Sequence, residues 1–133
     1  MLILDTHVLI WLDEGNSRLG NAALQAINTS LATGQLGVAT ISFWEIAMLI
    51  EKQRLALRMA LDIWRLDLLE AGLLEIPMQG ATALRAGQLR AFHGDSADRM
   101  IVATAIDNSA TLMTADEKIL SWGRFLPKID ARA

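Results

Sequence analysis

Short apolar runs alternate with longer amphipathic stretches along the chain, and this alternation constrains the fold more than any single motif. Short apolar runs predict buried strands, whereas apolar positions spaced by three or four residues predict helices. Strands separated by helices of ten or more residues need crossover connections, so we expect an α/β fold with a mostly parallel sheet covered on both faces. We expect strands at residues 2–4, 36–40, 73–76, 111–114 and 125–129, and helices at residues 6–12, 17–31, 42–53, 60–71, 79–92, 96–108 and 117–122.

The composition fits one domain, residues 1–133, with a large apolar core. Hydrophobic residues make up 53% of the chain, but charges interrupt every stretch before the ~20 apolar residues needed to span a bilayer. We therefore expect no membrane segment, and the N-terminus shows no signal peptide. The absence of cysteine favours a reducing cytoplasm. A net charge of −3 argues against a broad surface that coats nucleic acid, yet it leaves room for a local basic rim.

Four acidic residues are expected at one rim of this sheet. Asp5 directly follows the first strand, Glu45 lies one turn beyond the second, and Asp116 lies two residues after the strand at 111–114. Asp98 is in the first turn of its helix, and that N-terminus lies at the carboxyl ends of the strands if the helix runs antiparallel to them. Ligands of such sheets bind outside the carboxyl ends of the strands.

Each of these acids also has a purely structural explanation. Asp5 and Asp116 could cap helices, and Asp98 could complement a helix dipole. Glu45 could close a capping box that begins at Ser42. These roles leave unexplained why the acids gather at one rim, where neighbouring carboxylates repel each other and a divalent cation relieves the repulsion. Oxygen ligands of this kind suit Mg²⁺ or Mn²⁺, so metal-assisted hydrolysis of a phosphodiester is our hypothesis.

Other chemistries have weaker support in the sequence. His7 and His93 are far apart and no cysteine accompanies them, which disfavours a zinc hydrolase. The close glycine pair Gly34 and Gly37 precedes a strand and does not open a helix, so neither a dinucleotide fingerprint nor a phosphate loop is present. A receiver-like domain in which Asp5 is phosphorylated stays open.

Four segments of the chain carry a family resemblance. They are LDTH at residues 4–7, ISFWEIA at 41–47, HGDSADRMIVATA at 93–105 and LMTAD at 112–116. In this order and spacing they resemble the PIN domain, specifically the VapC-type toxin ribonucleases of bacterial toxin–antitoxin pairs. The resemblance implies a five-stranded parallel α/β/α sandwich, dependence on Mg²⁺ or Mn²⁺, and cleavage of an RNA substrate. It maps the family's catalytic acids to Asp5, Glu45, Asp98 and Asp116.

Within this set we expect Asp5, Asp98 and Asp116 to bind the metal, with Asp5 and Asp98 bearing most of the binding. Glu45 and Asp116 would orient a water or complete a second site. The resemblance also makes Thr6 and Thr114 polar neighbours that hold an acid or a metal-bound water.

Three further residues near Asp98 and Glu45 need an interpretation. Asp95 could join the metal shell, although capping the helix at 96–108 is the expected role. Arg99 is expected to tether a carboxylate, because it points about 100° away from Asp98 around the helix. Trp44 is expected in the core more than as a platform for base stacking, since its helix is apolar nearly all round. Similar sequences often carry Pro where this chain has Ser96.

Partners are expected on the apolar helices. The resemblance implies a small antitoxin, which would lay an amphipathic segment beside the helices at 43–53 and 60–71. The apolar surplus also predicts a two-fold homodimer. An interaction module or receiver-like module without nuclease activity is the alternative. We expect the antitoxin to contact Trp44, Met48, Met59, Ile63 and Trp64.

Overall fold

The computed structural model of the protein describes residues 1–123 and 125–133, and its centre is a five-stranded sheet. The strand order is β3-β2-β1-β4-β5, and every neighbouring pair is parallel. The predicted α/β class and the five strands are therefore confirmed. The strands are β1 (Leu2–Leu4), β2 (Leu36–Ala39), β3 (Leu74–Ile76), β4 (Thr111–Thr114) and β5 (Lys128–Asp130).

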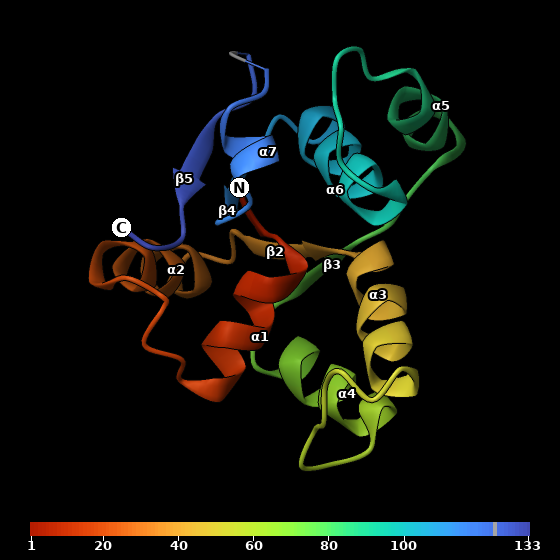
Figure 1. The fold of residues 1–133 in the computed structure, drawn as a ribbon. Helices are drawn as coiled ribbons and strands as arrows, with labels where there is room; N and C mark the ends of the chain where they lie inside the picture. Colours follow the sequence, from red (N-terminus) through yellow and green to blue (C-terminus); the bar gives the residue numbers. More distant parts are fainter. Residues whose placement is uncertain (124) are drawn as a thin grey trace.

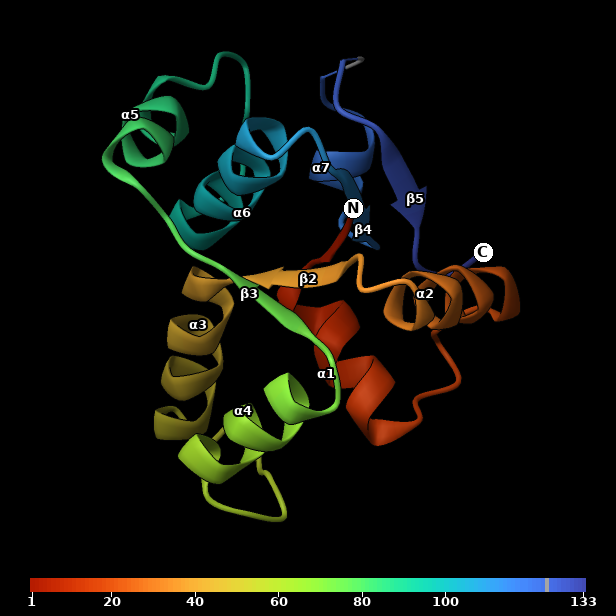
Figure 2. The same ribbon diagram turned by 180° about the vertical axis from the view of Figure 1, so that it is seen from behind.

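Helices fill the connections between consecutive strands. They are α1 (Thr6–Glu14), α2 (Asn21–Ala32), α3 (Thr40–Glu51), α4 (Leu61–Glu70), α5 (Gly80–Gln88), α6 (Ser96–Asp107) and α7 (Glu117–Leu120). Figures 1 and 2 show α1 to α4 on one side of the sheet and α5 to α7 on the other. In the part of the chain that is described, no helix has the length and apolar character needed to cross a membrane.

The two faces of the sheet have separate apolar cores, which makes three layers. Along β1, Leu2 and Leu4 belong to one buried cluster, together with Ile46 of α3. Ile3, which points to the other face, belongs to a second cluster with Ile101 of α6. Side chains alternate between faces along a strand, so a strand with no polar residue must be covered on both sides.

The order of the strands creates a switch point beside β1. The chain moves from β1 through β2 to β3 in one direction, and then returns to place β4 against the other edge of β1. Crevices at such switch points, outside the carboxyl ends of the strands, are where open α/β sheets bind ligands. The residues that follow β1 and β4 are Asp5 and Ala115, so the first predicted acid lies directly at this crevice.

Several predicted boundaries differ from the structure, including the end of the helix expected at 79–92, which is Gln88, and two of the differences have identifiable reasons. The helix expected from Ser17 begins at Asn21, because the Gly20 N–H that a Ser17 cap would bind donates instead to Ala131 O at 2.8 Å. The last strand, expected at 125–129, begins at Lys128. Pro127 has no N–H to donate and contributes only its carbonyl, which accepts from Leu112 N at 2.9 Å.

Candidate metal centre

Asp5 is held in place at the carboxyl ends of β1 and β4. It is only 2% exposed, and its two carboxylate oxygens accept hydrogen bonds from different groups. Oδ1 accepts from Thr6 N at 2.8 Å, which makes Asp5 the N-cap of α1, and Oδ2 accepts from the Thr114 hydroxyl at 2.7 Å. Asp116 N donates to the same Thr114 oxygen at 3.0 Å, so Thr114 links the two acids. Asp116 also caps α7 through Lys118 N.

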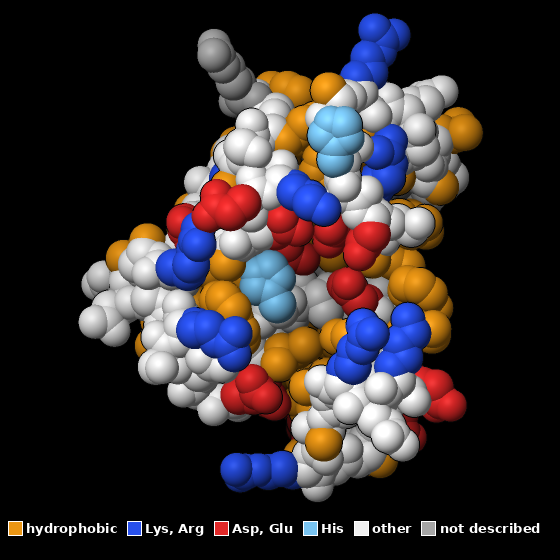
Figure 3. Space-filling model, in the orientation of Figure 1, with side chains coloured by type: hydrophobic (Ala, Val, Ile, Leu, Met, Phe, Trp, Pro, Cys, Tyr) orange, Lys and Arg blue, Asp and Glu red, His pale blue; other side chains and the backbone are white. Residues whose placement is uncertain are grey.

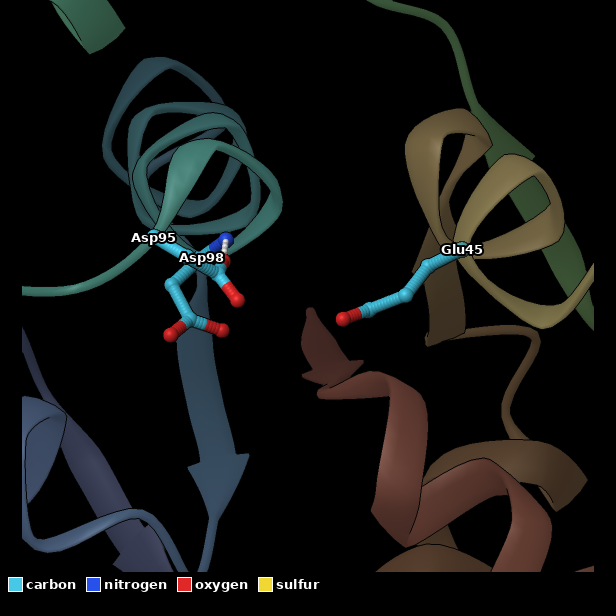
Figure 4. A group of neighbouring side chains, drawn as sticks. All are labelled: Glu45, Asp95 and Asp98. Atoms are coloured by element: carbon cyan, nitrogen blue, oxygen red, sulfur yellow. Dashed lines mark hydrogen bonds between the residues drawn. The ribbon is translucent and has the colours of Figure 1, made fainter. Parts of the chain in front are cut away.

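Glu45 enters the site from α3 in a way that the predicted capping box did not anticipate. That helix begins at Thr40, two residues earlier than expected, with Ala39 as its N-cap. Ser42 therefore lies inside the helix, fully buried, and its hydroxyl accepts from Thr6 Oγ1 at 2.9 Å. The capping box is wrong, and Glu45 is left free to point towards the N-terminus of α6 (Figure 4).

The N-terminus of α6 contributes two carboxylates. Asp95 is the N-cap, as expected, and its Oδ1 accepts from Asp98 N at 2.9 Å. Asp98 follows in the first turn of the helix, at the carboxyl end of the sheet. Figure 4 shows Asp95 and Asp98 on α6 facing Glu45 across the gap to α3. One carboxylate oxygen from each of the three lies within 4.8 Å of the others.

The carboxylates interact strongly with one another. The pKa of Asp98 is raised to about 7, first by burial and then by the charges of Asp5, Asp95, Asp116 and Glu45. Burial also raises the pKa of Glu45; the Thr6 hydroxyl opposes this rise, and the charges of Asp5 and Asp95 add to it. For Asp5, burial raises the pKa, and the nearby His7 and the hydrogen bonds from Thr114 and Thr6 oppose this rise, while the charge of Asp116 adds to it. All of the predicted acids therefore belong to one electrostatic unit.

This donor set fits a hard divalent cation. It consists of carboxylate and hydroxyl oxygens, the ligands that Mg²⁺ and Mn²⁺ prefer. Glu45 Oε1 is buried and, among the described residues, has no hydrogen-bond partner. A buried acceptor left without a donor is costly, and a cation among these oxygens would satisfy Glu45 and relieve the mutual repulsion.

His7 lies closer to the acids than the sequence indicated. Its Nε2 accepts from Ala115 N at 3.0 Å, so the ring proton is on Nδ1, which lies 3.7 Å from Asp5 Oδ2. The sequence holds one signal for this arrangement. His7 is two residues after Asp5, at the start of a helix that follows the strand almost directly.

Arg99 does not tether a carboxylate, so that prediction is wrong. Its guanidinium donates to four backbone carbonyls that precede α6. Nε reaches Ala86 O at 2.9 Å, Nη1 reaches Phe92 O at 2.9 Å, and Nη2 reaches Leu89 O at 2.9 Å and Gly87 O at 3.4 Å. Arg99 thus fixes the segment that leads from α5 to the acids of α6.

The residues expected to meet an antitoxin divide into two groups. Met48, Met59 and Ile63 are exposed, and Trp44 is 52% exposed, which contradicts its expected place in the core. Trp64 is 3% exposed and therefore cannot offer its ring on the surface as predicted. It packs edge-on against Phe43, because the face of α4 that carries it is the one turned towards α1 and α3.

Figure 3 shows the surface above this site. Acidic side chains gather in the middle of the face, and Lys and Arg side chains lie on both sides of them. Basic side chains therefore flank an acidic centre on this face, on a chain whose net charge is −3.

A parallel five-stranded α/β sheet with clustered carboxylates at its switch point defines the class of this protein. Residues 2–123 match the family described as PIN domain, and the chain belongs to that family. It is 37% identical over 124 residues to "Ribonuclease VapC22" of Mycobacterium tuberculosis (strain ATCC 25618 / H37Rv), which covers 90% of each chain.

Solved structures with similar folds support the same classification. "Crystal structure of VapBC2 from Rickettsia felis bound to a DNA fragment from their promoter" has a TM-score of 0.71 at 17% identity and covers 96% of each chain. "Toxin-antitoxin complex from Klebsiella pneumoniae" has a TM-score of 0.69 at 20% identity and covers 98% of each chain. At these identities the comparison concerns the fold.

Proposed function

We propose that this protein is a metal-dependent endoribonuclease and the toxin of a toxin–antitoxin pair. The observation that carries the proposal is the gathering of Asp5, Glu45, Asp95, Asp98 and Asp116 around one crevice, with a buried Glu45 oxygen that lacks a donor. The 37% identity to a ribonuclease over 90% of the chain supports the same activity. Residues 1–133 would act as a single PIN domain in the reducing cytoplasm.

Asp5, Asp98 and Asp116 are the proposed ligands of Mg²⁺ or Mn²⁺. Asp98 is the central ligand of this proposal, since the charges of four other acids raise its pKa: Asp5, Asp95, Asp116 and Glu45. The hydrogen bonds from Thr6 and Thr114 orient Asp5 without excluding a cation, because each carboxylate oxygen has two lone pairs.

When bound, the metal would activate water and stabilise the charge that develops on the phosphate. The chain itself would supply orientation. Glu45 would hold a water or complete a second site with Asp116. The Thr6 hydroxyl bonded to Ser42 fixes the start of α1 against α3, so that Asp5 and Glu45 keep their relative positions.

Incubation of the purified chain with total cellular RNA tests this activity. We expect discrete cuts that need added Mg²⁺ or Mn²⁺ and stop with excess chelator, and mapping of the cut ends would identify the RNA and the cleavage sequence. Cleavage that continues undiminished in chelator would contradict the metal mechanism.

The proposed antitoxin would lie along α3 and α4 and contact Trp44, Met48, Met59 and Ile63. A cavity of about 470 Å³ between α1, the 56–59 segment and α4 adjoins this surface, and both apolar and charged side chains line it, with Trp64 in its wall. The family resemblance adds that such antitoxins push a basic side chain towards the acids. An Arg there could pair with the carboxylates and exclude the metal.

We also propose a two-fold dimer formed through apolar helix faces. Large apolar side chains remain exposed on several helices, including Leu66 of α4 and Leu84 of α5. Their exposure fits association with a second copy. Light scattering at micromolar concentration should give the mass of two chains, and a strictly monomeric mass would rule the dimer out.

The alternative of an interaction or receiver-like module without nuclease activity has less support. A phosphorylated aspartate must be reachable by a phosphate donor, but Asp5 is buried and both of its oxygens already accept hydrogen bonds. A module that only binds a partner would not need five clustered carboxylates, where burial and then mutual repulsion raise the pKa of Asp98 to about 7.

A further inference from the structure

A second cavity adjoins the candidate metal centre. It lies between α3 and the N-terminus of α6 and has a volume of about 330 Å³. Glu45 and Asp95 line it at one end, so it opens directly from the acidic cluster. Its volume is within the range of pockets that bind small ligands. Most of the other side chains that line it are apolar or cationic.

The cavity follows one face of α3 away from the acids. Glu45, Met48, Leu49 and Lys52 are spaced by three or four residues, and all four line it. With a rise of about 1.5 Å per residue, the seven positions from Glu45 to Lys52 extend about 10 Å along the helix. The surface therefore changes from carboxylate through apolar to cation over a short distance.

The cationic end is fixed by the turn that closes α3. Lys52 N donates to Met48 O at 3.0 Å, and Arg54 N donates to Leu49 O at 2.8 Å. Between them, Gln53 has a φ of 58°, the left-handed conformation that lets the chain reverse at a helix end. Lys52 and Arg54 both line the cavity, one on each side of this turn.

Neither cation forms an ion pair within the described part of the chain. Arg65, Arg85 and Arg132, in contrast, pair with carboxylates. Two exposed cations that form no ion pair among the described residues, in the same cavity as carboxylates of the metal centre, are suited to an anion that must approach that centre. A phosphate group is such an anion.

The wall next to Glu45 is aromatic. Trp44 lines the cavity and is 52% exposed, although its helix offers buried positions to neighbouring apolar residues. An exposed indole beside cations is the combination that binds single-stranded nucleic acid, because bases stack on the ring while Lys or Arg holds the backbone. Stacking accepts any base and requires one that is unpaired.

We propose that this cavity binds one unpaired nucleotide of the RNA next to the scissile phosphate. Its base stacks on Trp44, and the phosphate on its far side pairs with Lys52 and Arg54. The inference rests on the proposed ribonuclease function and specifies where the RNA strand lies next to the scissile phosphate. The occupant is nucleic acid because the cavity has the candidate metal centre at one end and two cations at the other. In an RNA strand, one phosphate could lie at the metal while the next lies at the cations.

The test measures binding separately from cleavage. In an Asp98→Asn background, fluorescence anisotropy would follow a short labelled single-stranded RNA of mixed sequence as salt is varied. Replacing Lys52 and Arg54 together by Ala should weaken binding and lower the slope of log affinity against log salt by about 0.7 for each phosphate that is no longer neutralised. Trp44→Ala should weaken binding about 5-fold or more, whereas Trp44→Phe should retain most of it. A duplex RNA of the same length should show none of these differences.

Arg58→Ala is the matched control. Arg58 is an exposed cation of the same loop, but it lines the other cavity, the one of about 470 Å³ beside α1. It should leave RNA affinity unchanged. In the active chain, the Lys52 and Arg54 replacements should raise KM with little change in kcat. Unchanged RNA affinity and salt slope in the Trp44 and Lys52/Arg54 variants would overturn the inference.

Two further outcomes separate this inference from the proposals on which it draws. If the variants bind RNA normally but no longer bind the antitoxin, the cavity belongs to the protein partner and the nucleotide site is wrong. If Asp98→Asn cleaves RNA as well as the unchanged chain does, the assignment of the metal centre is wrong. The binding measurements still decide whether the cavity binds a nucleotide.

Discussion

The Thr114 hydroxyl donates to Asp5 Oδ2 at 2.7 Å and joins residues that are 109 positions apart in the chain. Both residues are buried, and they lie at the carboxyl ends of the neighbouring strands β4 and β1. The same hydroxyl oxygen accepts from Asp116 N. Thr114 therefore holds the first and last acids of the candidate metal centre in one hydrogen-bonded chain.

Replacing Thr114 with Val tests this link. The change keeps the shape of the side chain but leaves Asp5 Oδ2 without its donor, which should lower the free energy of unfolding by about 1–3 kcal/mol. It should also reduce RNA cleavage, because Asp5 loses its orientation. Denaturant unfolding and cleavage assays measure the two effects. Thr111→Val, at the other end of β4, is the control and should change neither by a comparable amount.

Arg99 provides a second test, directed at the segment before α6. Arg99→Lys keeps the charge but cannot reach four carbonyls with one ammonium group, so we expect a loss of about 1–3 kcal/mol in stability. Hydrogen exchange should become faster between residues 86 and 95. Arg90→Lys, an exposed neighbour, should have no such effect. Unchanged exchange in Arg99→Lys would show that the segment is fixed by other contacts.

The ion pair between Arg65 and Glu75 makes stability depend on pH. Arg65 donates to both carboxylate oxygens of Glu75, at 2.8 and 2.6 Å, and these hydrogen bonds hold the pKa of Glu75 below its ordinary value. A lowered pKa stabilises the folded state above the unfolded pKa of about 4.3, and this contribution is lost as the pH falls through the folded value.

Unfolding free energies measured from neutral pH to about pH 3 should therefore fall less steeply for Glu75→Gln than for the unchanged chain. The difference should be modest, because the pair is partly exposed. Glu70→Gln, at an exposed position of α4 with no ion pair among the described residues, should follow the unchanged chain. A steeper fall in Glu75→Gln would contradict the assignment.

Substitutions that introduce a charged side chain test the proposed antitoxin surface. Ile63 is 49% exposed on α4, so Ile63→Glu should fold normally but lose the partner. Met48→Glu should lose the partner as well. RNA cleavage by Ile63→Glu should persist. Pull-down of the proposed antitoxin from the source cell measures the loss. Leu24→Glu, which places the same charge at an exposed position of α2, is the control. Normal binding by Ile63→Glu would place the partner elsewhere.

Much of the fold could be predicted because strand and helix signals in this chain are local. The runs at 2–4 and 111–114 match β1 and β4, and the strand–helix alternation predicts a parallel sheet. Given a parallel sheet, residues that follow strands must share a rim, which is why Asp5 and Asp116 could be placed together. Asp5, Asp95 and Asp116 cap helices and also lie in the acidic cluster, so the structural and functional explanations hold together.

The errors concern properties that depend on tertiary contacts. Trp44 and Trp64 have similar local surroundings, yet one is exposed and the other buried, because burial depends on where α3 and α4 meet the rest of the core. The carbonyls that bind Arg99 come from residues up to 13 positions away, at the end of α5 and in the loop that follows it. The start of α3 two residues earlier than expected places Ser42 inside the helix, where it contacts Thr6, a contact that no local pattern encodes.

Asp98 is the residue on which the proposed metal centre depends most. Its pKa of about 7 means that the ionised form destabilises the folded chain near neutral pH when no cation is bound. Asp98→Asn removes this charge, so the metal-free protein should become more stable, by roughly 1 kcal/mol after allowance for its half-exposed position. Added Mg²⁺ or Mn²⁺ should raise the Tm of the unchanged chain and have little effect on the variant.

RNA cleavage by the unchanged chain and by Asp98→Asn, measured side by side after removal of metal and again after Mg²⁺ or Mn²⁺ is restored, tests the central claim most directly. We expect no cleavage by either protein without metal. Restored metal should return activity to the unchanged chain, while the variant should stay lower by a factor of about 100 or more. Cleavage without metal, or full activity of Asp98→Asn, would contradict a metal-dependent ribonuclease centred on these acids.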